Sequence, residues 1–192
     1  MGCNAFLENN FYWNTFTKSF KSQARNFFIK RAEKKGIPWE HLKNKYQNPN
    51  TFPLVQEKFE TVEKTSIVYP DYFLQPFHGY DNGNMNWDAA FENEASTLSI
   101  SSNYWSNIKP KDAAIRMRST FHDGIKKYQK NKSHASSILD VGCSVGISTT
   151  FLEEAFPQSK RIEGIDLSPY FLAIATLNTE HSKKLSRSEE HT

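Results

Sequence analysis

Two short apolar runs, each ending near an acidic residue, constrain the fold of this 192-residue chain most strongly. The first run, residues 137–141, contains Asp140 and leads into a glycine turn. The second run, residues 161–167, contains Asp166, 26 positions after Asp140. A strand, a glycine turn, a helix and a second strand ending in an acid form the unit that doubly wound folds use to hold an adenosine. The pattern therefore predicts an α/β fold with a parallel sheet and a ligand crevice at the carboxyl ends of the strands.

The glycine turn restricts the kind of ligand. Gly142 allows a sharp bend, and Gly146 allows the following helix to approach the strand closely. Asp140 at the strand end disfavours a pyrophosphate and suits a ligand with a cationic or hydrogen-bond-donating end. Asp166, at the end of the second strand, is placed to accept hydrogen bonds from both hydroxyls of an adenosine ribose.

Residues 140–146 read Asp-Val-Gly-Cys-Ser-Val-Gly and resemble the first motif of class I S-adenosylmethionine-dependent methyltransferases, acid-x-Gly-Cys-Gly-x-Gly. Residues 164–168, Gly-Ile-Asp-Leu-Ser, are typical of the second-strand segment of that family. Ser144 departs from the central glycine of the motif. The resemblance implies a Rossmann-like domain, S-adenosyl-L-methionine as the cofactor, and methyl transfer to an unidentified acceptor.

The resemblance also implies roles for single residues. Asp140 and the turn backbone would line the methionine half of the cofactor, and Asp166 would hold its ribose. Residues 72–87 are similar to the region before the first motif in uncharacterised methyltransferases, where aromatic residues often cover the cofactor; this makes Tyr80 and His78 candidates. The expected cofactor-binding residues are Asp140, Gly142, Cys143, Ser144, Gly146, Asp166, Leu167 and Tyr80.

Two other functions stay open. A NAD(P)-dependent oxidoreductase needs Gly-x-Gly-x-x-Gly, which the turn does not supply. A non-catalytic methyltransferase-like module could instead bind a partner through the basic, aromatic segment 15–35. No catalytic residue can be assigned: His78 could act as a base, but catalysis by positioning alone is equally compatible.

Composition restricts the partners. The net charge of +3 is too small to indicate a nucleic-acid partner, and no apolar stretch is long enough to span a bilayer. We therefore expect the methyl acceptor to be a small molecule. Cys3 and Cys143 are the only cysteines and have no metal-ligand spacing, so we expect a reducing intracellular compartment, cytoplasm or plastid, and no metal.

Four segments are expected: a helical extension and connector (1–68), a helical cap (69–135), the start of the methyltransferase domain (136–182), and a tail (183–192). Helices are predicted from Thr15 to Lys35, from Trp87 and Pro110 onward, and over 145–156 and 169–180, with Ser168 as an N-cap. Residues 36–66, which contain three prolines, are expected to be an irregular connector. Glu92 and Glu94 are expected on a solvated helix face.

Residues 187–192 match the translation of a widely used sequencing-library adapter, so the tail is left out of the predicted fold. Without it, the chain supplies two parallel strands, whereas the sheet of the methyltransferase family has seven. We therefore expect an N-terminal fragment whose parent protein is an enzyme and which is itself inactive.

Overall fold

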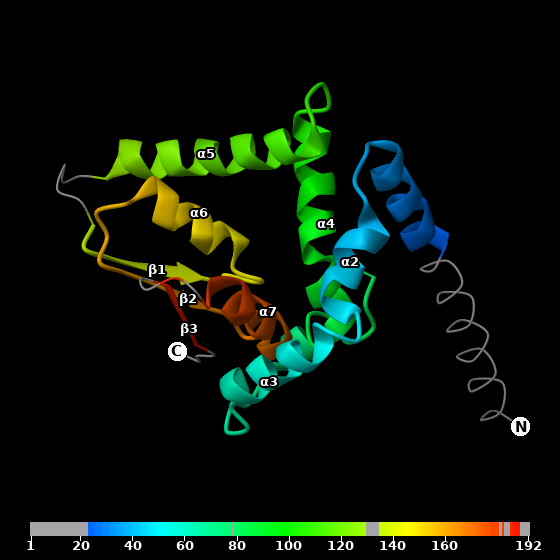
Figure 1. Cartoon of the computed structure of the whole chain (residues 1–192), viewed down its shortest axis with the longest axis horizontal. Coiled ribbons are helices and arrows are strands. Elements are labelled where there is room, and N and C mark those ends of the chain that lie inside the picture. The colour runs from blue at the N-terminus through cyan, green and yellow to red at the C-terminus, as the bar shows by residue number, and fades with distance from the viewer. Residues whose placement is uncertain (1–22, 78, 130–134, 181, 183–184, 189–192) are drawn as a thin grey trace, which may run out of the picture.

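A computed structural model describes residues 23–77, 79–129, 135–180, 182 and 185–188 of the chain. In this part of the chain, a small parallel sheet and its two helices lie at one end of the molecule, and a group of helices lies at the other (Figure 1). The fold is α/β and rich in helix, as the sequence predicted.

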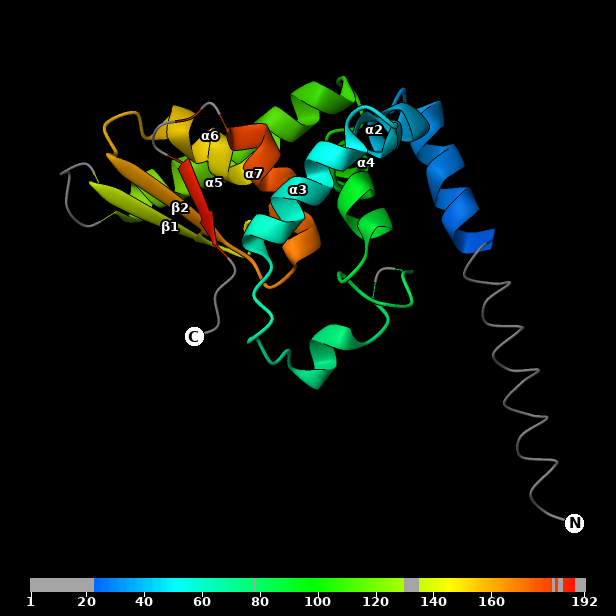
Figure 2. The same ribbon diagram turned by 60° about the horizontal axis from the view of Figure 1, so that its bottom comes forward.

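The elements follow one another along the chain, with the longest connection between α3 and α4. They are a helix over residues 23–34, α2 (Trp39–Gln47), α3 (Phe52–Val62), the 3₁₀ helix η1 (Asp71–Leu74), α4 (Trp87–Tyr104), α5 (Pro110–Tyr128), β1 (Ser137–Val141), α6 (Ile147–Ala155), β2 (Arg161–Ile165), α7 (Pro169–Thr179) and β3 (Leu185–Ser188). The helices up to α5 form what we call the cap, and the elements from β1 onward form the α/β unit. The stretch between α3 and α4, which contains η1, projects away from the other helices (Figure 2).

The expectation of an irregular connector over residues 36–66 is wrong. Helices α2 and α3 fill most of it, because Trp39, Tyr46, Val55 and Val62 point into the core and are buried. Pro38 is the N-cap of α2 and Pro53 lies in the first turn of α3, where a missing N–H removes no helical hydrogen bond. Proline position within the segment, rather than proline content, decides its structure.

The sheet has one more strand than the sequence predicted. β1 pairs in parallel with β2, and β2 pairs in parallel with β3. β3 lies inside the segment 183–192, which was expected to be a tail and was left out of the predicted fold. Its backbone pairs with hydrogen-bonding groups that would otherwise stay open along the edge of β2. With a single apolar residue, Leu185, the strand gives no periodic signal in the sequence.

One face of β1 is uncovered in the described part of the chain. Side chains alternate along a strand, so Ile138 and Asp140 share the face that contacts α6, and Leu139 and Val141 share the other. Leu139 and Val141 are both exposed. Parallel sheets in other proteins are usually covered on both faces.

The cap and the α/β unit share one hydrophobic core. Phe91 of α4 and Val55 of α3 belong to the same buried cluster as Phe171 and Ile174 of α7. An aromatic cluster around Trp87, which packs against Phe52, Phe59, Phe91 and Tyr170, extends this core. The position of the cap relative to the sheet is therefore fixed by packing between residues on either side of the segment boundary expected at residue 135.

Two helices of the cap leave large apolar side chains exposed. Along α5, Phe121, Ile125 and Tyr128 are exposed, and the buried positions are small residues and His122. Residues 23–34 are helical and Ala32 is buried, whereas Phe27 is exposed; the predicted start of that helix lies outside the described residues. None of the helices in the described part of the chain combines the length and hydrophobicity that a bilayer crossing requires.

Candidate functional site

The strand register brings the two predicted acids to one edge of the sheet. Asp140 pairs in register with Gly164, and Val141 with Ile165, so Asp166 comes directly after the strand next to Asp140. The carboxyl ends of both strands meet there, at the position where open α/β sheets bind ligands.

The glycine turn between β1 and α6 is bound to β2 through its own amide groups. The N–H groups of Gly142 and Cys143 both donate to the carbonyl of Ile165, at 2.8 and 3.0 Å. Gly142 and Gly146 have φ angles of 77° and 79°, which favour glycine. Because Ile165 occupies these two amides, they cannot bind a phosphate.

Asp166 links the turn to the start of α7. One carboxylate oxygen accepts the N–H of Ser144 and the other accepts the N–H of Ser168, both at 2.8 Å. Burial raises the pKa of the Asp166 carboxyl, backbone hydrogen bonds from Ser168, Ser144 and Leu167 lower it, and the nearby Asp140 carboxylate raises it; the net shift is upward. Each oxygen of a carboxylate can accept two hydrogen bonds, and the backbone of Leu167 also donates to Asp166, so the carboxylate keeps capacity for one further donor.

Asp140 is held away from the cavity. One of its oxygens accepts the hydroxyl of Thr149 at 2.6 Å and that of Ser148 at 3.4 Å, both in the first turn of α6. A carboxylate at this position stabilises the helix N-terminus. Its observed contacts are therefore structural, although its charge still acts on Asp166.

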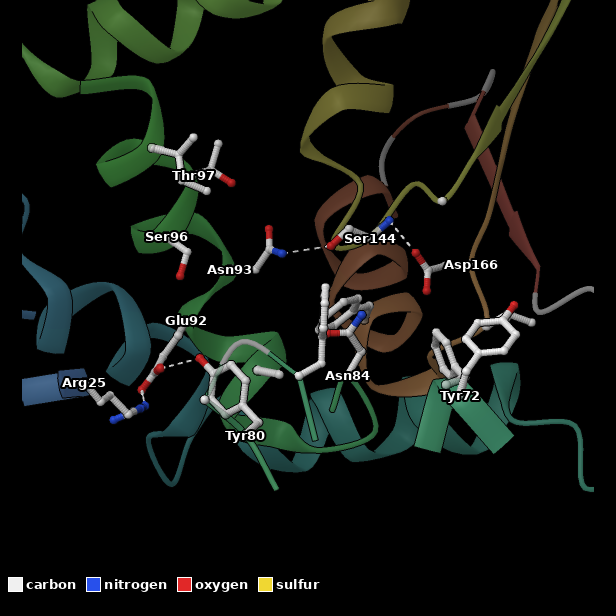
Figure 3. Close-up of a pocket in the computed structure, with 18 of the residues that line it drawn as sticks. Arg25, Tyr72, Tyr80, Asn84, Glu92, Asn93, Ser96, Thr97, Ser144 and Asp166 are labelled. Atoms are coloured by element: carbon white, nitrogen blue, oxygen red, sulfur yellow. Dashed lines mark hydrogen bonds and ion pairs between the residues drawn. The ribbon is translucent and has the colours of Figure 1, made fainter. Parts of the chain in front are cut away.

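A cavity of about 1110 Å³ lies between the α/β unit and the cap. Ser144 and Asp166 lie at one end, which we call the sheet end, and Arg25, Tyr80 and Glu92 lie at the other, which we call the cap end (Figure 3). The volume exceeds the range of roughly 300–1,000 Å³ typical of pockets for a single small ligand. The cavity therefore has room for a cofactor and a second small molecule.

The structure brings some of the predicted cofactor residues together and separates others. The residues that line the cavity are Tyr80, Gly142, Ser144, Asp166 and Leu167. The other three lie outside its lining: Asp140 binds α6, Cys143 is buried against Val62 and Leu172, and Gly146 is the N-cap of α6. His78 lies outside the described residues. Among the residues that the structure describes, no group of His, Cys, Asp and Glu side chains is arranged to hold a metal.

The cap end contains a buried charge cluster that the sequence did not predict. Glu92 is 1% exposed, not on a solvated face as expected. Its carboxylate binds the guanidinium of Arg25 and the ammonium of Lys43, and accepts the phenol of Tyr80 at 2.5 Å. Burial, followed by the hydrogen bond to Glu92, raises the pKa of Tyr80 well above its ordinary value, so its phenol stays protonated at neutral pH. Tyr80 therefore donates a hydrogen bond and cannot act as a base.

Asn93 connects the cap to the glycine turn. Its Nδ2 donates to Oγ of Ser144 at 2.9 Å, across 51 positions of sequence (Figure 3). Ser144 has a φ of 52°, in the left-handed region that costs an L-residue about 1–2 kcal/mol. Asn93 and Asp166 hold Ser144 in this conformation from opposite sides, one at its hydroxyl and one at its amide. The serine that departs from the family motif thus has a specific partner.

A double-mutant cycle tests this connection. Asn93→Leu removes the hydrogen bond while keeping the branched shape of the side chain, and should lower the free energy of unfolding by about 1 kcal/mol. Ser144→Gly removes the strained side chain, so in that background Asn93→Leu should cost much less. Denaturant unfolding of the four proteins gives the coupling free energy; equal costs of Asn93→Leu in both backgrounds would refute the connection.

Comparison with models of known protein families and with curated proteins gave no match for this chain. The function is therefore inferred from the chemistry of the cavity.

Proposed function

We propose that the chain carries the cofactor site of a class I S-adenosylmethionine-dependent methyltransferase. The main support is the sheet end of the cavity. There, two acids at the ends of adjacent strands flank a glycine turn whose leading amides are already bonded. Such a site has negative charge and no open anion-binding amides at Gly142, Cys143 or Ser144. It fits a ligand with hydroxyl donors and a positive charge.

Asp166 fits the ribose of the cofactor. Its two oxygens are fixed by backbone donors on either side, and the carboxylate keeps capacity for a ribose hydroxyl. A hydroxyl donor placed there would also offset the cost of burying the carboxylate. The turn around Ser144 would then face the methionine half of the ligand.

The same contacts count against a nicotinamide dinucleotide. A dinucleotide enzyme uses the amides of the glycine turn and the helix N-terminus to bind a pyrophosphate. Here Gly142 and Cys143 donate to Ile165, Ser144 donates to Asp166, and Asp140 accepts side-chain hydroxyls from the first turn of α6. A pyrophosphate at this turn would meet two carboxylates.

The chain's part in the reaction would be positioning. S-adenosylmethionine supplies an electrophilic methyl group on a positively charged sulfur. The walls of the cavity would hold that group in line with the acceptor's nucleophilic atom and exclude water, which can supply most of the rate acceleration of such a transfer. In the described lining, Glu92 is bound to two cations and Tyr80 is protonated. We therefore propose that neither Glu92 nor Tyr80 acts as a base in the reaction.

Isothermal titration calorimetry of the purified chain tests the proposal. S-adenosylhomocysteine, the reaction product, is expected to bind at a single site, and NAD is expected not to bind. The matched variant Asp123→Asn, which changes an exposed acid on α5, should bind S-adenosylhomocysteine as the wild type does. Binding of NAD with no binding of S-adenosylhomocysteine would overturn the proposal.

The raised pKa of Asp166 predicts a pH dependence. The ionised carboxylate accepts hydroxyls, so affinity for S-adenosylhomocysteine should fall on acidification, with a midpoint above the ordinary aspartate value of about 3.9. The stability of the ligand-free chain should have the opposite pH dependence. The folded chain retains the Asp166 proton more tightly than the unfolded chain does, so the free energy of unfolding should fall as pH rises through the raised pKa. Calorimetry and denaturant unfolding across this range measure both slopes. In Asp166→Asn both contributions should vanish; unchanged slopes would contradict the assignment.

A further inference from the structure

One face of α4 forms the wall of the cavity between its cap end and its sheet end. Asn93, Ser96 and Thr97 line the cavity from this face, as neighbours on the helix surface (Figure 3). All three residues are half-buried, and the hydroxyl oxygens of Ser96 and Thr97 are accessible to solvent. Ser101 and Ser102, on the same helix, are buried. A ligand in the cavity can therefore reach the hydroxyls at 96 and 97.

The helix itself does not use these two hydroxyls. Serine and threonine inside a helix commonly donate to the carbonyl four residues earlier. In this chain, Ser102, Thr150 and Thr179 do so, at 2.8, 3.1 and 2.7 Å. Ser96 and Thr97 make no side-chain hydrogen bond to the part of the chain that the structure describes. Both hydroxyls can therefore donate to a ligand.

Asn93 places this wall next to the proposed ribose site. Asp166 accepts the Ser144 N–H at 2.8 Å, and the Ser144 hydroxyl accepts Nδ2 of Asn93 at 2.9 Å. A ligand whose ribose contacts Asp166 and which extends past Ser144 therefore meets α4 next. Because Nδ2 of Asn93 donates to Ser144, the amide oxygen of Asn93 remains as an acceptor at this point.

The leading amides of the glycine turn cannot bind a carboxylate. The N–H groups of Gly142, Cys143 and Ser144 already donate to β2 and to Asp166. Asp140, which was expected to line the methionine half of the cofactor, accepts hydroxyls of α6 instead. A carboxylate at the end of the ligand therefore needs donors from another wall of the cavity. Hydroxyl groups are suitable donors, because hydrogen bonds to an ionised acceptor are the strong ones.

We propose that α4 binds the α-amino acid end of S-adenosylmethionine. The hydroxyls of Ser96 and Thr97 donate to its carboxylate, and the Asn93 amide oxygen accepts from its ammonium group. This inference rests on the proposed function and assigns one end of the cofactor to the cap. The cap then distinguishes the cofactor from nucleosides that have no amino acid.

Two nucleosides that differ only at this end test the inference. S-adenosylhomocysteine has the α-amino acid. 5′-Methylthioadenosine has the same adenine, ribose and thioether sulfur, but a methyl group in place of the amino acid chain. In titration calorimetry, the wild-type chain should bind S-adenosylhomocysteine at least about tenfold more tightly than 5′-methylthioadenosine, because only the first ligand contacts α4.

The double variant Ser96→Ala/Thr97→Val removes both hydroxyls and keeps the shape of each side chain. It should weaken S-adenosylhomocysteine binding by about tenfold or more and change 5′-methylthioadenosine binding by less than about twofold. Ser119 and Thr120 of α5 are a matched adjacent pair, exposed and outside the cavity lining. Ser119→Ala/Thr120→Val should bind both ligands as the wild type does. Thr97→Ser, which keeps the hydroxyl, should retain the wild-type affinity for S-adenosylhomocysteine.

The outcomes separate this inference from the proposed function. Denaturant unfolding shows whether each variant is folded, and Ser96→Ala and Thr97→Val alone give the same comparison if the double variant is not. An unchanged affinity for S-adenosylhomocysteine, or equal losses for the two ligands, would overturn the inference and leave the proposed function standing. So would equal affinities of the wild-type chain for the two ligands. A wild-type chain that binds neither ligand would reject the proposed function, and the inference with it.

Discussion

Asp166→Asn should weaken the binding of S-adenosylhomocysteine by roughly 10- to 100-fold, because it removes a charged acceptor worth about 1.5–3 kcal/mol. Asparagine has the shape of aspartate, but its amide carries one acceptor oxygen instead of two. One of the N–H groups of Ser144 and Ser168 would then face an NH₂ group. The variant thus removes the proposed ribose contact and loosens the turn that lies beside it.

The stability of the same variant separates binding from folding. The carboxylate is buried and its pKa is raised, so the loss of its charge relieves a desolvation cost that partly offsets the lost hydrogen bond. The free energy of unfolding should therefore change by no more than about 1 kcal/mol. Calorimetry and denaturant unfolding measure the two quantities. An unchanged affinity, with Asp123→Asn as the control, would mean that Asp166 does not contact the ligand.

Glu92→Gln should lower the free energy of unfolding by about 2–4 kcal/mol, the largest effect on stability that we expect in this chain. The substitution keeps the volume but leaves Arg25 and Lys43 without their common anion inside the protein. The side chains of Arg25 and Lys43 are 31% and 18% exposed, so water can partly solvate them. The loss of unfolding free energy should therefore be smaller than for a fully buried ion pair. The Tyr80 phenol also loses its charged acceptor.

Glu94→Gln is the matched control, two positions away on α4. Its carboxylate forms an ion pair with Lys45 at 3.9 Å, and both side chains reach solvent. Surface pairs of this kind contribute about 0–1 kcal/mol, so the control should lie close to the wild type. Similar losses in the two variants, measured by denaturant unfolding, would show that the cap-end cluster has no special energetic role.

Local patterns in the sequence were sufficient to place the α/β unit. β1 was predicted at its observed bounds, and α7 begins at Pro169 with Ser168 as its N-cap, accepting the Phe171 N–H. Likewise, α5 begins at Pro110. Each of these signals lies within a few residues of the feature that it predicts, which explains why one sequence could reveal them.

The cap end was not predictable because its contacts join distant parts of the chain. Glu92 meets Arg25 across 67 positions, and Asn93 meets Ser144 across 51. On α4 alone, both residues have the pattern of a polar helix face. Only the packing of the helix over residues 23–34 and of α2 against α4 turns that face inward. β3 was missed for the same reason, because this segment becomes a strand only by pairing with the edge of β2.

Mapping where S-adenosylhomocysteine binds tests the proposed function most directly. Amide NMR spectra of the chain, recorded during titration with S-adenosylhomocysteine, report which residues change their surroundings. We predict the largest shifts at residues 142–147 and 166–168, with smaller shifts at Asn93. Shifts confined to other surfaces, or no shifts with S-adenosylhomocysteine but shifts at the glycine turn with NAD, would contradict a methyltransferase cofactor site.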